Sequence, residues 1–430
     1  MPRYCILGLF LIQSFLSVCQ TWQLLPNSPS ATFRHDDIYF CNADTGWAVN
    51  VDGYIYKTTD GGLTWNTQLY QPATSFRCVG FVNSQKGWAG NLGPGRWSPT
   101  TDTMPMYQTN DGGNTWQVVT NINGPLPKGI CGISIVNDTV AYAVGRVEGP
   151  CNIMKTTNGG LSWVSQALDS MAYYIIDAKF FSPDTGVMVG CTGYTNNENI
   201  AVFYTVDGAQ TWQQTYSSTY NGHGWKVTFP SRKVGYVSIE TASNATPIPI
   251  LATKDGGLNW TTKTLSIAQQ GIGFINDSTG WCGFWINQGK MTTDSGNTWV
   301  STPFVEHFNR FRKINDTLAY ACGKRIWKYT PQTVGIHSLD APPKDLLIQN
   351  SPNPFTDKTT IKYHLPGDGK VQLRVYDWVG RPVETLVNSE QAAGAHEVVF
   401  ATSAPGNYTF FYTLTFEGYS VTKKMTMVQK

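Results

Sequence analysis

The chain has 430 residues and carries 31 lysine and arginine residues against 29 aspartate and glutamate residues. This balance, without a long run of one sign, argues against nucleic acid or an anionic membrane surface as the main partner. Charged residues make up only 14% of the chain, whereas glycine, tryptophan and tyrosine are abundant. Such a composition is typical of short strands joined by turns.

The first 19 residues have a basic start, an apolar run and small residues near Ser17–Cys19. This order is typical of a secretory signal peptide, and the run is short for a membrane span. We therefore expect residues 1–19 to be a signal peptide that is cleaved near Cys19–Gln20. A lipoprotein signal through Cys19 is a weaker alternative, because the bulky Val18 precedes it. No other apolar stretch is long enough to cross a bilayer, so no transmembrane segment is expected in the mature chain.

Without Cys5 and Cys19, seven cysteines remain, and they are scattered without CxxC spacing. Buried free thiols are the simplest interpretation. A disulfide between Cys131 and Cys151 in an oxidising compartment remains open. The six histidines are dispersed as well, so no metal site and no cofactor are expected.

A ten-residue phrase, first written TTDGGLTWNT at Thr58–Thr67, occurs six times. Its repeats are spaced by 51, 47, 49, 48 and 39 residues, which is the length of one four-stranded propeller blade. Seven strand-like segments of the type DTGWAV (Asp44–Val49) accompany these phrases, and most of them follow an alternating strand. The third residue of the phrase is Asp60, Asp111, Asn158, Asp207, Asp255 and Asp294.

Six phrases against seven upstream segments leave one blade without its outer strand. The segment TWQLL (Thr21–Leu25) matches TWQVV (Thr115–Val119), so the N-terminal strand is predicted to complete the last blade. That pairing would close the ring and remove an open sheet edge. We predict an all-β fold with a seven-bladed β-propeller over residues 20–331.

The repeated phrase is interpreted as structural. Its carboxylate can accept hydrogen bonds from the amides of a tight turn, its glycines can adopt positive φ, and its tryptophan can be buried between blades. Six carboxylates on six blades cannot converge on one substrate, and the phrase lacks the dense carboxylate pattern of a calcium loop.

The pattern Ser/Thr-x-Asp-x-Gly-x-x-Trp resembles the Asp-box, or bacterial neuraminidase repeat. Together with the TGWAV strands it is most similar to propellers of the photosystem II assembly-factor type (Ycf48-like). This resemblance implies the fold rather than a function, because Asp-boxes occur in sialidases, receptors and non-enzymes. Phe33-Arg34 is followed by His35-Asp36, where sialidases have Ile-Pro, and this departure argues against sialidase activity.

The repeat stops at Pro331, and residues 332–345 are predicted to be a linker. Residues 346–430 alternate in strand fashion and predict a small antiparallel β-sandwich of immunoglobulin-like type.

Several motifs of this last domain follow one another in order: NSPNPF (Asn350–Phe355), TTIKYHLP (Thr359–Pro366), VQLRVYDWVGRPV (Val371–Val383) and a terminal TKKMTMVQK. Together they resemble the type A C-terminal sorting domain of the type IX secretion system. The resemblance implies Sec export, passage across an outer membrane, and a secreted or cell-surface protein whose partner is the secretion machinery. Lys423 and Lys424 lie where the secretion signal of that family is recognised. An ordinary immunoglobulin-like accessory domain is the alternative.

Loops from second to third strands, and from one blade to the next, should emerge on the face opposite the Asp-boxes. Aromatic and charged residues around a central opening there would suit a glycan or polypeptide ligand. Space filling is the alternative for Trp225 and Trp285. The candidates on this face are Trp97, Trp225, Trp285, Arg34, Arg77, Arg96, Arg146, Arg310, Glu148, Glu198, Glu240 and Glu306.

No HExxH, Gly-x-Ser-x-Gly or P-loop motif occurs, and no catalytic residue is assigned. We expect a non-catalytic binding or adhesion module for glycan or protein. A secreted glycoside hydrolase, sialidase-like or of another propeller class, is the alternative, and an assembly or scaffold factor is a third.

Overall fold

The computed structural model describes residues 20–95, 100–194, 197–241, 248–265, 269–283, 289–302, 307–331, 345–378, 381–403, 406–416 and 419–429, and none of these residues is helical. The chain divides into two compact units, of which one is Gln20–Pro331 and the other contains the described residues after Pro331. This division falls where the repeat ends. The predicted signal peptide and nearly all of the predicted linker lie outside the described residues.

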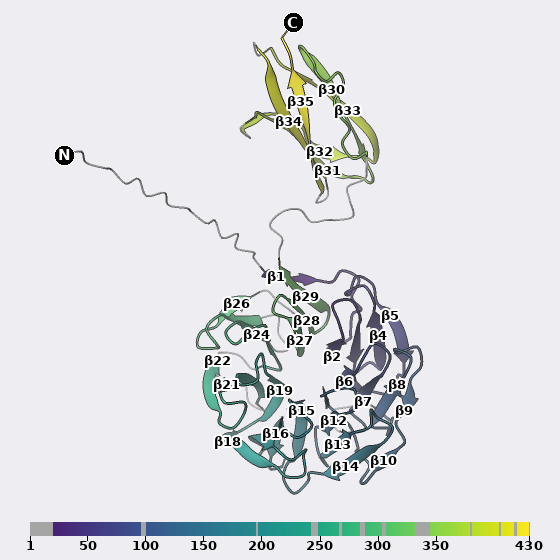
Figure 1. The fold of residues 1–430 in the computed structure, drawn as a ribbon, viewed down its shortest axis with the longest axis vertical. Coiled ribbons are helices and arrows are strands. Elements are labelled where there is room, and N and C mark those ends of the chain that lie inside the picture. The colour runs from purple at the N-terminus through teal and green to yellow at the C-terminus, as the bar shows by residue number, and fades with distance from the viewer. Residues whose placement is uncertain are drawn as a thin grey trace, which may run out of the picture. The chain divides into compact units, whose positions relative to one another are not determined.

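The strands of the first unit form seven sheets arranged in a ring (Figure 1). In six of the sheets, consecutive strands pair in antiparallel order, and the third sheet also has a short parallel strand, β10, at its outer edge. The strands of these six sheets are β2 (His35–Phe40), β3 (Gly46–Asn50), β4 (Tyr54–Thr58), β5 (Asn66–Tyr70); β6 (Phe76–Phe81), β7 (Gly87–Asn91), β8 (Met106–Thr109), β9 (Gln117–Val118); β10 (Ile122–Asn123), β11 (Gly132–Ile135), β12 (Ala141–Gly145), β13 (Asn152–Thr156), β14 (Trp163–Ala167); β15 (Tyr174–Phe180), β16 (Gly186–Thr192), β17 (Asn199–Thr205), β18 (Gln213–Asn221); β19 (His223–Thr228), β20 (Gly235–Glu240), β21 (Ile248–Thr253), β22 (Thr261–Leu265); β23 (Gly271–Phe274), β24 (Gly280–Gly283), β25 (Gly289–Thr292) and β26 (Val300–Thr302).

The seventh sheet joins the two ends of this unit. It contains β27 (Arg310–Asn315), β28 (Leu318–Cys322), β29 (Ile326–Pro331) and, as its outer strand, β1 (Gln20–Leu24). β1 is antiparallel to β29, from the pair Gln20–Pro331 to the pair Leu24–Trp327. The predicted closure by the N-terminal strand is therefore confirmed, and the all-β propeller with it.

Neighbouring sheets pack through stacked rings at repeat positions. Trp47 stacks on Phe81 of the next sheet at a centroid distance of 3.5 Å. Within one sheet, Phe40 covers Gly46 so closely that a Cβ at this glycine would lie 2.6 Å from the ring. The glycine of the TGW pattern is thus required because a phenylalanine ring occupies the space of its side chain.

The Asp-box turns show the hydrogen bonds expected of a structural element. In the first turn, Asp60 Oδ1 accepts from Thr58 Oγ1 (2.8 Å) and from Thr64 N (2.9 Å), and Trp65 Nε1 donates to Gly62 O (3.1 Å). The Asp60 carboxylate is therefore committed to its own turn. The later Asp-box residues repeat the bond from the preceding threonine hydroxyl: Asp111, Asn158, Asp207, Asp255 and Asp294.

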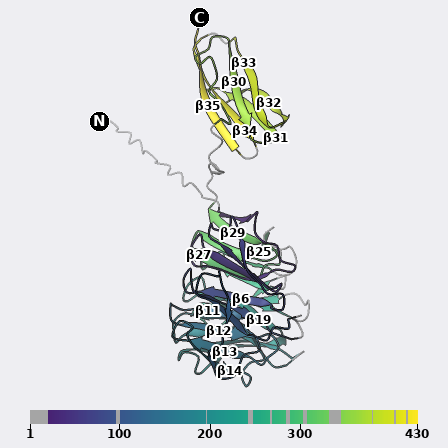
Figure 2. The same ribbon diagram turned by 90° about the vertical axis from the view of Figure 1, so that its right-hand side faces the viewer.

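The second unit has two antiparallel sheets. One pairs β30 (Lys358–Leu365) with β33 (Gly394–Ala401) (Figure 2). A cluster that includes Ile361, Leu373 and Tyr412 fills the common core. The other sheet has the order β32 (Pro382–Gln391), β31 (Gly369–Tyr376), β34 (Tyr408–Phe416) and β35 (Tyr419–Met427).

The NSPNPF motif holds the end of β35. Phe355 N donates to Thr426 O (3.0 Å), and Thr426 N donates to Asn353 Oδ1 (2.9 Å). Lys424 is exposed and Lys423 is half-buried, whereas Met425 is buried in the core. The two lysines are thus positioned by a strand that the motif and the core together fix.

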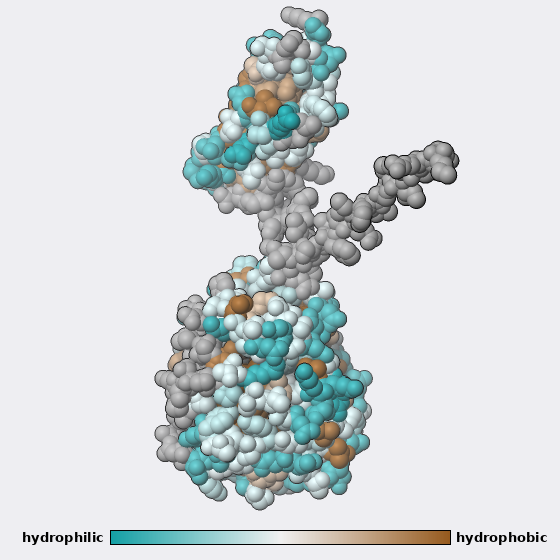
Figure 3. Space-filling view, turned by 90° about the vertical axis from the view of Figure 1, so that its left-hand side faces the viewer, coloured by the Kyte–Doolittle hydropathy of each residue, from teal (hydrophilic) through white to brown (hydrophobic). Residues whose placement is uncertain are grey.

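Exposed apolar residues of the propeller are scattered. The view in Figure 3 shows small, separate hydrophobic areas on this unit rather than one continuous patch. Within the described part of the chain, no helix has the length and apolar character needed to span a membrane.

Candidate functional site

The Asp-box turns define one face of the ring. Gly61 N donates to Asp44 O (2.8 Å), so the turn between the first and second strands lies beside the Asp-box turn of the same sheet. The starts of the innermost strands, such as β2, β6, β19 and β27, therefore lie towards the opposite face, around the centre of the ring (Figure 1). Charged residues gather there.

Two arginines share one aspartate at this centre. Arg34 Nε and Arg77 Nη1 lie 3.2 and 2.6 Å from Asp36 Oδ1. Both guanidinium groups also lie over the ring of Trp225, at 5.6 and 5.3 Å from its centroid. Trp225 Nε1 donates to Asn309 Oδ1 (2.9 Å). We call these five residues the Asp36 cluster.

The Asp36 cluster keeps polar atoms that are buried without a partner. Asp36 Oδ2 and Arg77 Nε form no hydrogen bond with the described residues, although both side chains are buried. Buried polar atoms without a partner are costly and are rare in native structures. The cluster therefore contains two enclosed polar atoms that the described protein groups leave unpaired.

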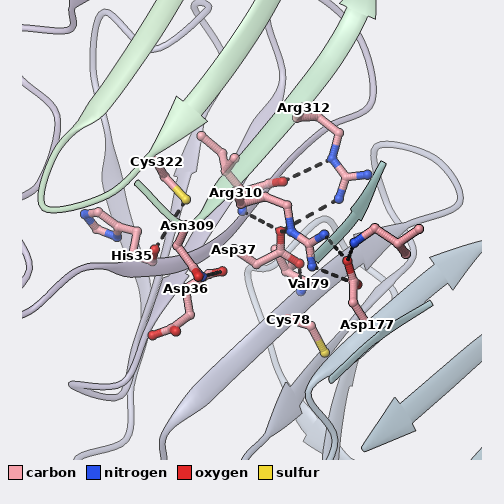
Figure 4. Close-up of polar contacts among 12 residues, drawn as sticks. His35, Asp36, Asp37, Cys78, Val79, Asp177, Asn309, Arg310, Arg312 and Cys322 are labelled. Carbon is pink, nitrogen blue, oxygen red and sulfur yellow. Dashed lines mark hydrogen bonds and ion pairs between the residues drawn. The ribbon is translucent and has the colours of Figure 1, made fainter. Parts of the chain in front are cut away.

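A second group of charges lies beside it (Figure 4). Arg310 Nε is 2.9 Å from Asp37 Oδ1, and its Nη1 is 2.8 Å from Asp177 Oδ2. The two aspartates also accept backbone amides of the neighbouring sheets, from Val79 to Asp37 (3.0 Å) and from Val227 to Asp177 (3.1 Å). These carboxylates hold sheets together, and we interpret them as structural.

Burial and neighbouring charge set the ionisation of this second group. Burial alone would raise the pKa of Asp177, but the charges of Arg310 and Lys226 lower it below its ordinary value. Burial lowers the pKa of Lys226 to about 8, and the charge of Arg310 adds to this effect. Lys226 forms no ion pair within 4 Å among the residues that the structure describes.

Aromatic rings lead outward from the Asp36 cluster. His223 lies 5.5 Å from Trp225 and 5.6 Å from Tyr174, measured between ring centroids. Tyr174 stacks on Tyr173 at 4.5 Å, and Tyr173 lies 5.0 Å from Tyr194, which is 73% exposed. Glu198 comes from the same β16–β17 loop as Tyr194. We call Tyr173, Tyr174, Tyr194, Glu198 and His223 the tyrosine patch.

The predicted ligand contacts are more deeply placed than the sequence suggested. Trp225 is only 7% exposed and packs with Tyr174, so it fills space beneath the face, which was the alternative interpretation. Arg34, Arg77 and Arg310 line the centre through ion pairs. Arg146 is also buried, and it donates to Pro94 O (2.7 Å), so it holds loop backbone. The remaining candidates lie outside the described residues: Arg96, Trp97, Trp285 and Glu306.

Several residues of the centre were missed in the sequence. Asp37 and Asp177 stand at the same position of two innermost strands, directly before Ile38 and Ala178. The sequence signal that could have identified both aspartates is a charged residue inside a strand that is buried on both faces. Tyr173 and Tyr194 carried no signal, because tyrosines are common throughout this chain.

The acids of the centre are committed to other groups. Asp36, Asp37 and Asp177 pair with arginines, and Glu240 Oε2 accepts from Gln270 Nε2 (2.7 Å). In the described segments, no three His, Cys, Asp or Glu side chains are grouped so that they could hold a metal ion. The seven cysteines from Cys41 to Cys322 are free thiols.

Comparison with protein-family models and with curated protein sequences gives no match. Among solved structures, YCF48 bound to D1 peptide is 18% identical, covers 72% of this chain and 96% of that chain, and has a TM-score of 0.53. YCF48 from Cyanidioschyzon merolae is 18% identical, with coverages of 73% and 99% and a TM-score of 0.55. An ancestral GH74 enzyme is 11% identical, with coverages of 94% and 63% and a TM-score of 0.51. The resemblance to YCF48 propellers is thus confirmed for the fold.

Proposed function

We propose that the protein is an exported, non-catalytic binding module whose propeller binds a polypeptide segment on the face opposite the Asp-box turns. The observation that carries this proposal is that two separate groups with charges of opposite sign lie on one face. Arg34 and Arg77 of the Asp36 cluster face Asp36, with Glu240 also acting on both, and Glu198 of the tyrosine patch forms no ion pair within the described residues. A polypeptide can present both charges with aromatic and apolar groups between them, whereas a neutral glycan cannot.

Hydrolysis is the weaker candidate. A glycosidase needs two carboxyl groups at a defined separation, one of them free to exchange a proton with the substrate. The central aspartates are instead held by guanidinium groups and backbone amides. The similarity to a GH74 enzyme is one of fold, and so is the similarity to YCF48 bound to a peptide. The latter supports the proposal only in that a propeller of this fold can hold a peptide.

Peptide and glycan arrays probed with the chain from Gln20 test the binding proposal. We expect signal on peptide spots, reduced at least tenfold by Trp97→Ala, a sequence-derived candidate. Trp378→Ala is the matched control, because Trp378 is 72% exposed in the C-terminal unit. Signal on glycans alone would replace the polypeptide by a carbohydrate ligand, and cleavage of those glycans would favour the hydrolase.

We propose further that the C-terminal unit directs export through the type IX machinery, with Lys423 and Lys424 in the recognised segment. Changing both lysines to alanine should retain the protein in the periplasm. Met425 and Met427 stay in the core, so the unit should remain folded. The double variant of the exposed lysines Lys362 and Lys370 is the control.

The fraction of protein in the culture medium and at the cell surface is the readout for these variants. Release of the Lys423/Lys424 variant at the level of the unmodified protein would refute the sorting assignment.

A further inference from the structure

We propose that the tyrosine patch is a subsite for a cationic side chain, a lysine or arginine of the bound polypeptide. This inference rests on the proposed function and specifies one part of the ligand. It is argued from Glu198, from the rings around it and from the charges of the neighbouring loops.

The Glu198 side chain has no hydrogen-bonding or charged partner among the described residues. The residue is 7% exposed, and its side chain forms no hydrogen bond or ion pair with the rest of the described chain. Its carboxylate oxygens are not among the fully enclosed polar atoms, so they remain accessible to a ligand. A ligand cation would supply the charged partner.

The loops hold Glu198 in a fixed position. Its N–H donates to Asn221 Oδ1 (3.0 Å), and its carbonyl accepts from Gly222 N (2.9 Å). Tyr194 is tied to the same loop, because Asn197 N donates to Tyr194 O (2.8 Å). The backbone therefore presents the carboxylate and the exposed ring together, which preorganises the subsite.

The rings around Glu198 suit an organic cation. Burial and, after it, the charge of Glu198 raise the pKa of Tyr174. Tyr173 stacks on Tyr174, and Tyr194 tilts at 53° to Tyr173. Lysine and arginine bind favourably over the faces of such rings within about 6 Å. A metal ion would instead need several carboxylate or imidazole ligands, which the described residues do not assemble here.

The neighbouring charges reinforce this preference. Glu148 also acts on Tyr174, in the same direction as Glu198. His223 Nε2 lies 3.7 Å from Glu240 Oε2. Two glutamate charges therefore act on the Tyr174 ring of the patch.

Binding of small probes to the chain from Gln20 tests the subsite. We would use Nα-acetyl-lysine methylamide and Nα-acetyl-arginine methylamide, with the Nε-acetylated lysine compound as the uncharged control, in ligand-observed NMR titrations. We expect the two cationic probes to bind at least tenfold more tightly than the uncharged one. Glu198→Gln and Tyr194→Ala should each weaken the cationic probes at least tenfold.

Two controls separate the subsite from general effects. Tyr70→Ala removes a 52% exposed tyrosine of another sheet, and Asp277→Asn removes an exposed carboxylate of a β23–β24 turn. Neither should change probe binding. Thermal unfolding of Glu198→Gln should match that of the unmodified chain, because the side chain loses no hydrogen bond or ion pair with the described residues.

Equal binding of charged and uncharged probes, or full binding by Glu198→Gln, would overturn the inference. Array peptides that bind without any preference for lysine or arginine would also overturn it while the proposed function stands. Binding of glucosamine in place of the lysine probe would reject both the cationic side chain and the polypeptide ligand.

Discussion

Replacing Trp22 by alanine should lower the free energy of unfolding by about 3 kcal/mol, the cost typical of removing a packed tryptophan. Trp22 belongs to the closing strand β1 and packs in the cluster of Trp281, Phe311 and Tyr329. Its ring lies 5.4 Å from Trp281 of the preceding sheet and 5.1 Å from Tyr329 of its own sheet. One side chain therefore joins the last two sheets of the ring and anchors the strand that closes it.

Gln23→Ala is the matched control, because Gln23 is exposed on the same strand and pairs through its backbone with Lys328. We expect a change within about 0.5 kcal/mol for this variant. Starting the chain at Pro26 should lower stability further and promote association, since it bares the edge of β29. Urea unfolding followed by tryptophan fluorescence measures all three, and an unchanged midpoint for Trp22→Ala would contradict the closure argument.

The fold could be predicted from the sequence because each sheet repeats the same local sequence features. The Asp-box turn, the glycine beneath a phenylalanine ring and the alternating innermost strand all act within one blade, so their spacing determines the architecture. The closing strand followed from counting, since Thr21–Leu25 matches an outer strand that the last blade lacks. The extra strand β10 has no counterpart in the other blades, and its two residues left no periodic signal.

The centre of the ring could be predicted only in outline. Arg34, Arg77 and Arg310 were assigned to the correct region, but the aspartates that pair with Arg77 and Arg310 come from other blades. The contact between Asn309 and Asp36 joins residues 273 positions apart in the sequence. Repeat spacing shows which strand end a residue occupies, whereas the distance across the ring depends on the packing of all the blades. Burial of Trp225 and exposure of Tyr194 follow from that packing.

Replacing Lys226 by methionine should stabilise the protein at pH 7, by on the order of 3 kcal/mol. Lys226 is 2% exposed, and burial lowers its pKa to about 8. An unfolded lysine has a pKa of about 10.4. Keeping this ammonium group charged therefore costs free energy in the folded state but not in the unfolded state. Methionine has a similar length, keeps the apolar contacts of the stem and removes the charge.

The pH dependence of this difference is its specific signature. Between pH 8 and about 10.4 the unfolded state binds more protons at Lys226 than the folded state, so this residue's contribution to the free energy of unfolding rises with pH. The advantage of Lys226→Met should therefore be full below pH 8 and disappear towards pH 10.4. Buried thiols act in the opposite direction, since burial raises the pKa of Cys151 to about 12, but they are common to both proteins and cancel in the comparison. Lys362→Met, at an exposed position, should show no such trend.

A Lys226→Met protein that is less stable at pH 7 would mean that the ammonium group is compensated at the centre of the ring, where its charge would then help to hold Asp37 and Asp177 in place.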